Sequence, residues 1–255
     1  MSTVLQIYEA IDRLAPFFLS MDFDNTGILV GDRQKKVERA LLALDCTKEV
    51  LRQAKELGAQ LIITHHPIIF HPIKRVNEDS LVYHLLRSDI AVISAHTNLD
   101  IAQGGVNDLL AKRIGLSDCR GLQPMDAQGT FFLGRVGSLP EGMETQQFAQ
   151  YLKQRLGAPS VKFVAADRTV KTVALCGGAG ADCLEDAIRV GADALLTSEV
   201  KQHEYLAAAA AGISIFDAGH FDTEDVVIEP LWEYLTKQFA DVEFFTTHHT
   251  VIRAV

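Results

Sequence analysis

The chain has 255 residues, of which 48% are hydrophobic. This length suits one large or two modest domains, and the composition excludes a disordered chain. The net charge is -9, which argues against general binding to nucleic-acid backbones but allows one nucleotide in a metal-lined pocket. Four scattered cysteines without a CxxC pair indicate free thiols in a reducing compartment. Neither a signal peptide nor a bilayer-spanning run is visible, so we expect a cytoplasmic protein.

The first part of the chain alternates helical and extended patterns. Ser2 or Thr3 can cap a helix that ends near Leu14. A short strand is predicted to end at Gly31, and further strands are predicted at 37–45, 61–64 and 90–94. Helices are predicted at 47–57, at 80–87 and from the Gly104–Gly105 pair through residue 114. This alternation is typical of a parallel sheet covered by helices.

The later part of the chain repeats this pattern after a change of character. Residues 121–171 predict a β-α-β segment, with a strand at 131–136, a helix at 145–156 and a strand at 161–165. From residue 172, strands are predicted at 173–176, 194–197 and 213–216, with helices at 181–190 and up to 211. Residues 57–64 resemble 190–197, and residues 90–96 resemble 213–220, which suggests two related halves.

These patterns predict an α/β fold. We expect two related α/β halves with mostly parallel sheets that face a shared metal cleft, plus a central β-α-β insertion. The predicted domains are an N-terminal half at 1–120, a linking module at 121–171 and a C-terminal half at 172–255. Ligands in such folds bind at the carboxyl ends of the strands, so the residues that follow each strand are the candidates for function.

Two adjacent histidines follow the strand at 61–64. Imidazole is a ligand for zinc, iron, copper or nickel, so His65 and His66 are candidate metal ligands. Because successive strand side chains point to opposite faces, both rings can reach one site only if the backbone bends there. Pro67 favours such a bend. The alternative is one capping and one solvated histidine.

Two further strand ends supply the other candidate ligands. Asp100 follows the strand at 90–94, together with His96, which is a ligand or a hydrogen-bonding partner of one. His220 and Glu224 follow the strand at 213–216. Asp222 is an alternative to Glu224, whose longer reach we prefer. Three imidazoles and two carboxylates suit two metal ions with open coordination positions, especially if one carboxylate bridges.

Other polar features are interpreted more simply. The Gly177–Gly180 stretch favours a tight strand-helix turn over a contact to an anionic substrate, because it lacks the spacing of a phosphate-binding motif. Asp22 and Asp24 are more typical of turn capping than of metal binding. The remaining histidines are predicted to be ordinary surface or strand-flanking residues, and they are His71, His84, His203, His248 and His249.

At these positions the chain resembles the GTP cyclohydrolase 1 type 2 family, also called Nif-three-like dinuclear metal-centre proteins. The matching motifs are Asp24-Asn25-Thr26-Gly27 with Val30-Gly31, Leu44-Asp45-Cys46-Thr47, Thr64-His65-His66-Pro67, Ser94-Ala95-His96-Thr97-Asn98-Leu99-Asp100, and Gly219-His220 with Glu224. The resemblance implies that His65, His66, Asp100, His220 and Glu224 hold two divalent ions, with Glu224 bridging. It also implies a ring-shaped homohexamer whose metal sites face an inner cavity.

Two departures from the family pattern concern contacts to substrate. Phe23 stands where the family usually has tryptophan, and Thr197–His203 differs from its usual Gly-Glu and His-His pattern. The metal ligands are expected to survive both differences. The different sequence at Thr197–His203 puts in doubt the contacts that this segment makes to substrate in the family.

The ligand set leaves three classes of function open. The first is a metal-dependent hydrolase of a nucleotide or other small molecule, in which two ions about 3.5–4 Å apart lower the pKa of water towards about 7. In it, His96 or, as the less favoured alternative, His203 moves a proton. The others are a non-catalytic metal-binding adaptor or regulator and a metal-storage protein. Zinc, iron, manganese and cobalt all fit mixed nitrogen and oxygen ligands. Expected partners are further copies of the chain and a small-molecule substrate, with no membrane; a nucleic acid inside the ring is disfavoured by the acidic charge.

Overall fold

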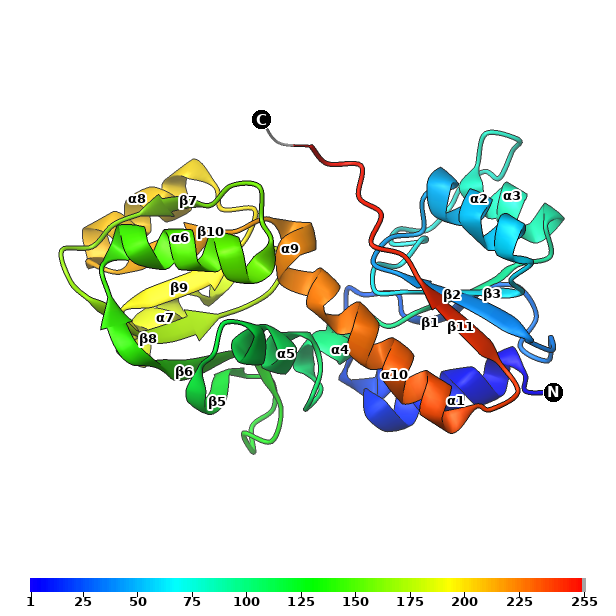
Figure 1. Cartoon of the computed structure of the whole chain (residues 1–255), viewed down its shortest axis with the longest axis horizontal. Helices are drawn as coiled ribbons and strands as arrows, with labels where there is room; N and C mark the ends of the chain where they lie inside the picture. The colour runs from blue at the N-terminus through cyan, green and yellow to red at the C-terminus, as the bar shows by residue number, and fades with distance from the viewer. Residues whose placement is uncertain (254–255) are drawn as a thin grey trace. The chain divides into compact units, whose positions relative to one another are not determined.

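The computed structural model describes residues 1–253, which pack into two compact units (Figure 1). Unit one comprises Met1–Ala102 and Val227–Val251. Unit two comprises Gln103–Val226, together with Ile252 and Arg253. These limits differ from the domain boundaries expected after residues 120 and 171. The chain enters unit two after residue 102 and returns to unit one at residue 227.

Unit one contains a five-stranded sheet in the order β1-β4-β3-β2-β11. All neighbouring strands run parallel except β1 and β4, which are antiparallel. The strands are β1 (Gly27–Val30), β2 (Arg39–Ala43), β3 (Leu61–Thr64), β4 (Ala91–Ser94) and β11 (Glu243–Thr246). The helices of this unit are α1 (Val4–Leu14), η1 (Phe17–Leu19), α2 (Lys48–Leu57), α3 (Leu81–Arg87), α4 (Thr97–Ile101) and α10 (Ile228–Gln238).

Helices cover both faces of this sheet. Helices α2 and α3 lie on one face (Figure 1). They bury Val50 and Leu85 in a core with Leu41 and Ile62. Helices α1 and α10 lie on the opposite face (Figure 1). Because β2, β3 and β4 are buried on both sides, they consist almost entirely of apolar residues, which is why the sequence predicts them well. As expected, Thr3 caps the start of α1, where it forms a capping box. Gly58, in the left-handed backbone conformation, ends α2.

Unit two contains a six-stranded sheet in the order β5-β6-β8-β9-β10-β7. Only β8, β9 and β10 are parallel neighbours. The strands are β5 (Ser117–Pro124), β6 (Phe132–Met143), β7 (Lys162–Val164), β8 (Val170–Leu175), β9 (Ala194–Thr197) and β10 (Ser214–Asp217). The helices are α5 (Val106–Arg113), α6 (Thr145–Leu156), η2 (Ala181–Cys183), α7 (Leu184–Arg189), α8 (Gln202–Ala211), α9 (His220–Glu224) and η3 (Asp225–Val227).

Alternate residues of the central strands of unit two enter two separate cores. Val173 and Leu175 pack with Phe148 of α6 and Leu110 of α5. Ala174, between them in the strand, packs with residues of α7 and α8 on the other face. This alternation follows from the period of two along a strand. Because both faces are covered, residues 173–175 of β8, 194–196 of β9 and 215–216 of β10 are all apolar.

The element order confirms an internal repeat. The series α1-β1-β2-α2-β3-α3-β4 in unit one matches α6-β7-β8-α7-β9-α8-β10 in unit two, and both series form three parallel strands with an antiparallel edge strand. The predicted α/β class with two related halves is therefore confirmed. The central β-α-β segment is present as β6, α6 and β7, and its last two elements are the counterparts of α1 and β1.

The strand β5 and the helices α4 and α10 were not anticipated from the sequence, and neither were the 3-10 turns η1 and η3. Strand β11 lies at a sheet edge, and His248 and His249 follow it as expected. All four cysteines, Cys46, Cys119, Cys176 and Cys183, are free thiols, as predicted. Among residues 1–253, each helix is too short or too polar to cross a membrane.

Candidate metal-binding site

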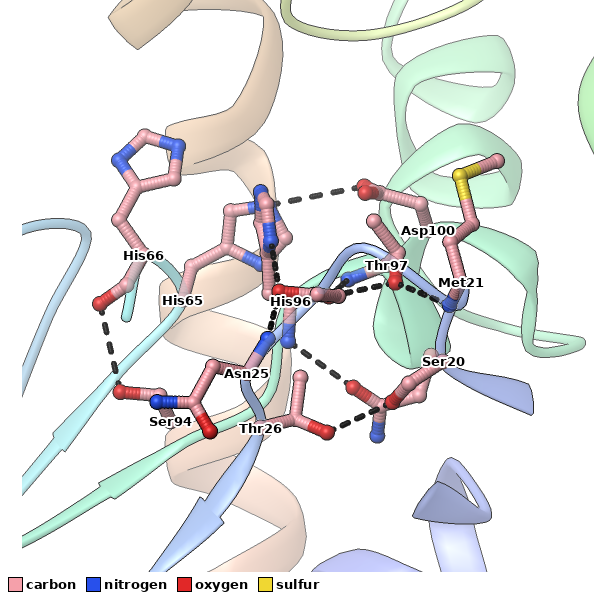
Figure 2. A network of polar contacts seen from close by, with 12 residues as sticks. Ser20, Met21, Asn25, Thr26, His65, His66, Ser94, His96, Thr97 and Asp100 are labelled. Atoms are coloured by element: carbon pink, nitrogen blue, oxygen red, sulfur yellow. Dashed lines mark hydrogen bonds and ion pairs between the residues drawn. The ribbon is translucent and has the colours of Figure 1, made fainter. Parts of the chain in front are cut away.

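The backbone bends where β3 ends, and this bend brings two neighbouring imidazoles together. The hydroxyl of Thr64 donates to the carbonyl oxygen of His66 at 2.8 Å. The hydroxyl of Ser94 donates to the same oxygen at 3.3 Å (Figure 2). The His66 N–H donates to the carbonyl oxygen of Leu44 at 3.0 Å. With its peptide groups held in this way, the ring of His66 lies 5.0 Å from that of His65, centroid to centroid. The backbone bend that both rings need to reach one site is therefore present at the end of the strand.

A third imidazole and a carboxylate come from the end of β4. The ring centroid of His96 lies 5.1 Å from that of His65 and 5.5 Å from that of His66. One ring nitrogen of each histidine lies within 4.8 Å of the others. Asp100 is 8% exposed on the helical turn α4, and its Oδ1 lies 3.6 Å from Nε2 of the fully buried His65 side chain (Figure 2). Unit one therefore gathers His65, His66, His96 and Asp100.

The Nδ1 atom of each of these histidines faces an oxygen acceptor. His65 Nδ1 lies 2.8 Å from the carbonyl oxygen of Ala95, and His66 Nδ1 lies 2.7 Å from Oδ1 of Asp45. Carbonyl and carboxylate oxygens only accept, so Nδ1 carries the hydrogen. In a neutral ring the lone pair is then on Nε2. This arrangement orients histidines that bind metals through Nε2.

Asp24 orients His96 in the same way. Its Oδ1 accepts from His96 Nδ1 at 2.9 Å, and its Oδ2 accepts from the backbone N–H and the hydroxyl of Thr97, at 3.0 and 2.5 Å. Burial alone would raise the pKa of Asp24, but the hydrogen bonds from His96 and Thr97 outweigh it and lower the pKa to about 2. Asp24 is therefore ionised at neutral pH. The sequence suggested a turn cap at this position, and the hydrogen bond from the Asn25 N–H is only part of its role.

Unit two places an imidazole and a carboxylate on one face of α9. Nε2 of His220 lies 3.0 Å from Oε2 of Glu224, four residues later in the helix. Nδ1 of His220 lies 2.7 Å from Oε1 of Glu199. With Nδ1 protonated towards Glu199, Nε2 and the Glu224 oxygen can approach this closely only around a proton or a cation. Glu224, rather than Asp222, is thus the carboxylate that faces His220.

A glycine leaves the room that this pair needs. Gly178 follows β8 in the Gly177–Gly180 turn and has φ +62°. A Cβ atom built there would lie 2.0 Å from Oε1 of Glu224 and 3.0 Å from Nε2 of His220. The carbonyl oxygen of Gly178 accepts from the hydroxyls of Thr197 and Ser198, at 3.1 and 2.5 Å. The turn is a tight strand-helix connection, as the sequence suggested, and it also borders the candidate ligands.

The internal repeat relates the ligand-bearing turns of the two units. His96 and Asp100 are four residues apart after β4, and His220 and Glu224 are four residues apart after β10. Each pair sits on or beside a one-turn helix, α4 or α9. Likewise His65 and His66 follow β3, whereas Ser198 and Glu199 follow β9. The two units thus present related but different sets of donors.

The donor set fits divalent cations that accept nitrogen and oxygen ligands. It offers oriented imidazoles and buried carboxylates, which suit zinc, iron, manganese or cobalt. One free cysteine, Cys46, lies beside Asp45, the residue that orients His66. Burial, and to a smaller extent the Asp45 carboxylate, raise the pKa of the Cys46 thiol to about 12. Cys46 therefore stays protonated at neutral pH and does not compete as a thiolate ligand.

We expect Cys46 to react slowly with alkylating reagents. With a pKa of about 12, its thiolate fraction at pH 8 is on the order of a thousand times below that of a thiol with a pKa of about 8.5. Iodoacetamide labelling followed by peptide mass spectrometry measures this rate, and thermally unfolded protein provides the reference rate for the same residue. Equal labelling rates of Cys46 in folded and unfolded protein would contradict the raised pKa of its thiol.

Several supporting residues escaped the sequence analysis. Asp45 and Glu199 had no assigned role, yet they hold His66 and His220, and both stand directly beyond the ends of strands, β2 and β9. The rule that pointed to His65, polar residues at carboxyl ends of parallel strands, points to them as well. Of the histidines regarded as ordinary, His203 has a side chain that is 76% exposed.

Glu199 combines a functional contact with backbone strain. It has φ +54°, which costs a non-glycine residue about 1–2 kcal/mol. We expect Glu199→Gly and Glu199→Ala both to lower metal affinity about 10–100-fold, because His220 loses the acceptor that orients it. Glu199→Gly should nevertheless be more stable than Glu199→Ala by about 1 kcal/mol, because glycine tolerates this φ. Metal titration measures the affinity, and thermal melting measures the stability. Equal stability of the two variants would show that the backbone at residue 199 is not strained.

The structure thus defines an α/β protein whose strand ends carry oriented imidazoles and carboxylates suited to metal ions. The sequence matches the family described as DUF34/NIF3 (NGG1p interacting factor 3) over residues 2–252. The chain belongs to this family. It is 35% identical to a GTP cyclohydrolase 1 type 2 homolog of Clostridium perfringens over 251 residues, which cover 94% of each chain.

Solved structures agree with this assignment. A hypothetical protein of Staphylococcus aureus is 28% identical and superimposes with a TM-score of 0.91 over 99% of each chain. A Bacillus cereus protein related to NIF3 has a TM-score of 0.94 at 24% identity, over 100% of this chain and 99% of the other, and shows the fold. The family resemblance expected from the motifs is confirmed.

Proposed function

We propose that this protein binds two divalent metal ions through His65, His66, Asp100, His220 and Glu224. The observation that carries the proposal is that Nδ1 of every imidazole in this set is held by an oxygen acceptor, which leaves Nε2 for a cation. Oδ1 of Asp100 and Oε2 of Glu224 each face such an Nε2 atom within their own unit. The family resemblance adds that the five residues serve one dinuclear centre with Glu224 bridging, and we adopt this as part of the proposal.

We further propose that the protein is a metal-dependent hydrolase of a nucleotide or another small molecule. A bound divalent ion supplies Lewis acidity and lowers the pKa of water towards about 7. His96 is the group in unit one suited to move a proton, because Asp24 holds its Nδ1–H and leaves Nε2 as the basic atom. The GTP cyclohydrolase 1 type 2 name of the relatives supports a nucleotide as the first substrate class to examine.

Assembly and location are proposed on the same basis. The resemblance supports a homohexameric ring. Four free thiols, two of them buried, fit a reducing compartment such as the cytoplasm. Sedimentation of the purified protein tests the first point, since a hexamer of 28.0 kDa chains sediments far faster than a monomer.

The decisive experiment is elemental analysis of protein purified without added metal, followed by an activity screen with the identified ion restored. We expect about two divalent ions per chain and turnover that disappears when a chelator removes them. Metal-loaded protein that turns over no nucleotide, phosphate ester or amide in a broad screen would contradict the hydrolase. Protein that takes up no divalent ion would contradict the metal centre itself.

A further inference from the structure

Two exposed aromatic side chains stand beside the histidines of unit one. Phe23 is 63% exposed and Phe70 is 39% exposed. Their ring centroids are 6.2 Å apart, and the centroid of Phe70 is also 6.2 Å from that of His96. We call these two residues the Phe23–Phe70 pair. A single exposed aromatic residue needs no explanation, but two that meet at the edge of a candidate catalytic cluster do.

The loops that carry this pair are held by polar contacts rather than by packing of the rings. The side-chain amide of Asn25, two residues after Phe23, donates to the carbonyl oxygen of Ile69, the residue before Phe70, at 2.5 Å. The N–H of Met21 donates to the hydroxyl of Thr97 at 2.9 Å (Figure 2). The same network includes Asp24, which orients His96. The rings are therefore presented on fixed loops, and their placement relative to His96 is set before any ligand binds.

The geometry of the pair suits a planar guest. The ring planes of Phe23 and Phe70 are inclined by 58°, so the rings are not stacked on each other, and both side chains are exposed. The ring of His71 also meets Phe70 edge-on, with centroids 4.9 Å apart. Phe70 meets His96 edge-on, at 79°. Neither phenylalanine has a hydrogen-bonding group, so the pair contributes contact area without selecting among edge substituents. Stacking of a base on an aromatic side chain is worth about 1–3 kcal/mol.

We propose that the Phe23–Phe70 pair binds a planar aromatic ring of the substrate, such as a nucleobase. This inference rests on the proposed function, because the reacting group of the same molecule would then lie towards the histidines. A ligand that lacks a planar ring would lose this contact. The Phe23–Phe70 pair thus restricts the substrate to small molecules with a planar aromatic ring. The histidine cluster alone would not impose this restriction.

Calorimetric titration with three probes that carry a planar aromatic ring and one matched probe that lacks it tests the proposal. Guanosine, uridine and flavin monophosphates are compared with ribose 5-phosphate, which keeps a phosphorylated five-carbon sugar but has no aromatic ring. We expect at least one ring-bearing probe to bind metal-loaded wild-type protein more tightly than ribose 5-phosphate. Phe70→Leu should weaken that binding about 5- to 150-fold, the equivalent of about 1–3 kcal/mol. Phe23→Leu should act in the same direction, whereas Phe23→Trp should retain binding.

A matched control separates this contact from a general loss of exposed apolar surface. Phe163 of unit two is 37% exposed, close to the value of Phe70, and Phe163→Leu should leave the binding of every probe unchanged. The affinity for ribose 5-phosphate should be the same in all variants. Saturation-transfer NMR gives a second readout, because the aromatic protons of the probe should receive more saturation than its ribose or ribityl protons.

Three results would overturn the inference. The ring-bearing probes could bind no better than ribose 5-phosphate, or both leucine variants could bind them as wild type does. The leucine variants could also change only the sedimentation of the protein, which would assign the rings to a contact between copies of the chain. Elemental analysis of the same samples distinguishes the failures: normal metal content with any of these results rejects the ring contact alone, whereas absent metal rejects the proposed function.

Discussion

His65→Ala should abolish metal-dependent turnover while the protein stays folded. The side chain of His65 is fully buried, its Nδ1 is held by the carbonyl oxygen of Ala95, and its Nε2 lies 3.6 Å from Oδ1 of Asp100. A metal ion contributes several kcal/mol of transition-state stabilisation, so its loss should reduce turnover by about 10³-fold or more. Elemental analysis and initial rates, measured on the same preparation, report both losses.

The fold should survive because the stability of this region comes from its neighbours. Ile62 and Ile63 of β3 are buried in the cores on either side of the sheet, and the substitution leaves both in place. A loss of about 1–3 kcal/mol is expected, and thermal melting detects it. His84→Ala, on helix α3, is the matched control and should keep both metal and activity. Full turnover by His65→Ala would refute its role.

Gly178→Ala should weaken metal binding by displacing Glu224. The added methyl group would lie 2.0 Å from Oε1 and 2.9 Å from Cδ of Glu224, which is far inside contact distance. The carboxylate must move away from Nε2 of His220, or the turn must shift. Changes to groups that position ligands cost about 10–100-fold in metal affinity, and a displaced ligand should cost at least as much. Competition with a chromogenic chelator measures the affinity.

Gly212→Ala separates this clash from backbone strain. Gly212 has φ +67°, close to the +62° of Gly178, but a Cβ atom there would meet nothing within 4 Å. Both variants should lose about 1–2 kcal/mol of stability from the left-handed backbone. Only Gly178→Ala should also lose metal affinity. Equal metal affinity in the two variants would show that Glu224 is not a ligand or that it moves without consequence.

The parts of the fold that the sequence predicts best are those in which local and tertiary preferences agree. Strand β3 and helix α6 have the predicted limits because an apolar run or a helical period is closed by a clear signal, His65 after the strand and Gly157 after the helix. Strand β5 escaped notice because it is an edge strand whose first four residues are exposed, so no burial pattern marks it. Helix α4 escaped because a one-turn helix is too short for a period to be seen.

The candidate site shows a similar division. The side chains with metal chemistry, such as His65 and His220, can be recognised from residue type and position after a strand. The strand-end rule marks Asp45 and Glu199 as candidates too, but it does not tell which histidine each residue orients. Asp24, Asp45 and Glu199 act through contacts spanning 72, 21 and 21 residues of sequence. Their roles depend on strand order in the sheet, and one sequence without strand pairing does not supply it.

Anomalous diffraction from crystals grown with zinc tests most directly whether the oriented imidazoles and the acidic residues facing them hold divalent ions. We expect anomalous peaks about 2.0–2.1 Å from Nε2 of His65, His66 and His220, with oxygen atoms of Asp100 and Glu224 at about 2.0–2.2 Å from the same peaks. Anomalous peaks located only elsewhere, with these five side chains bound to no ion, would contradict this expectation.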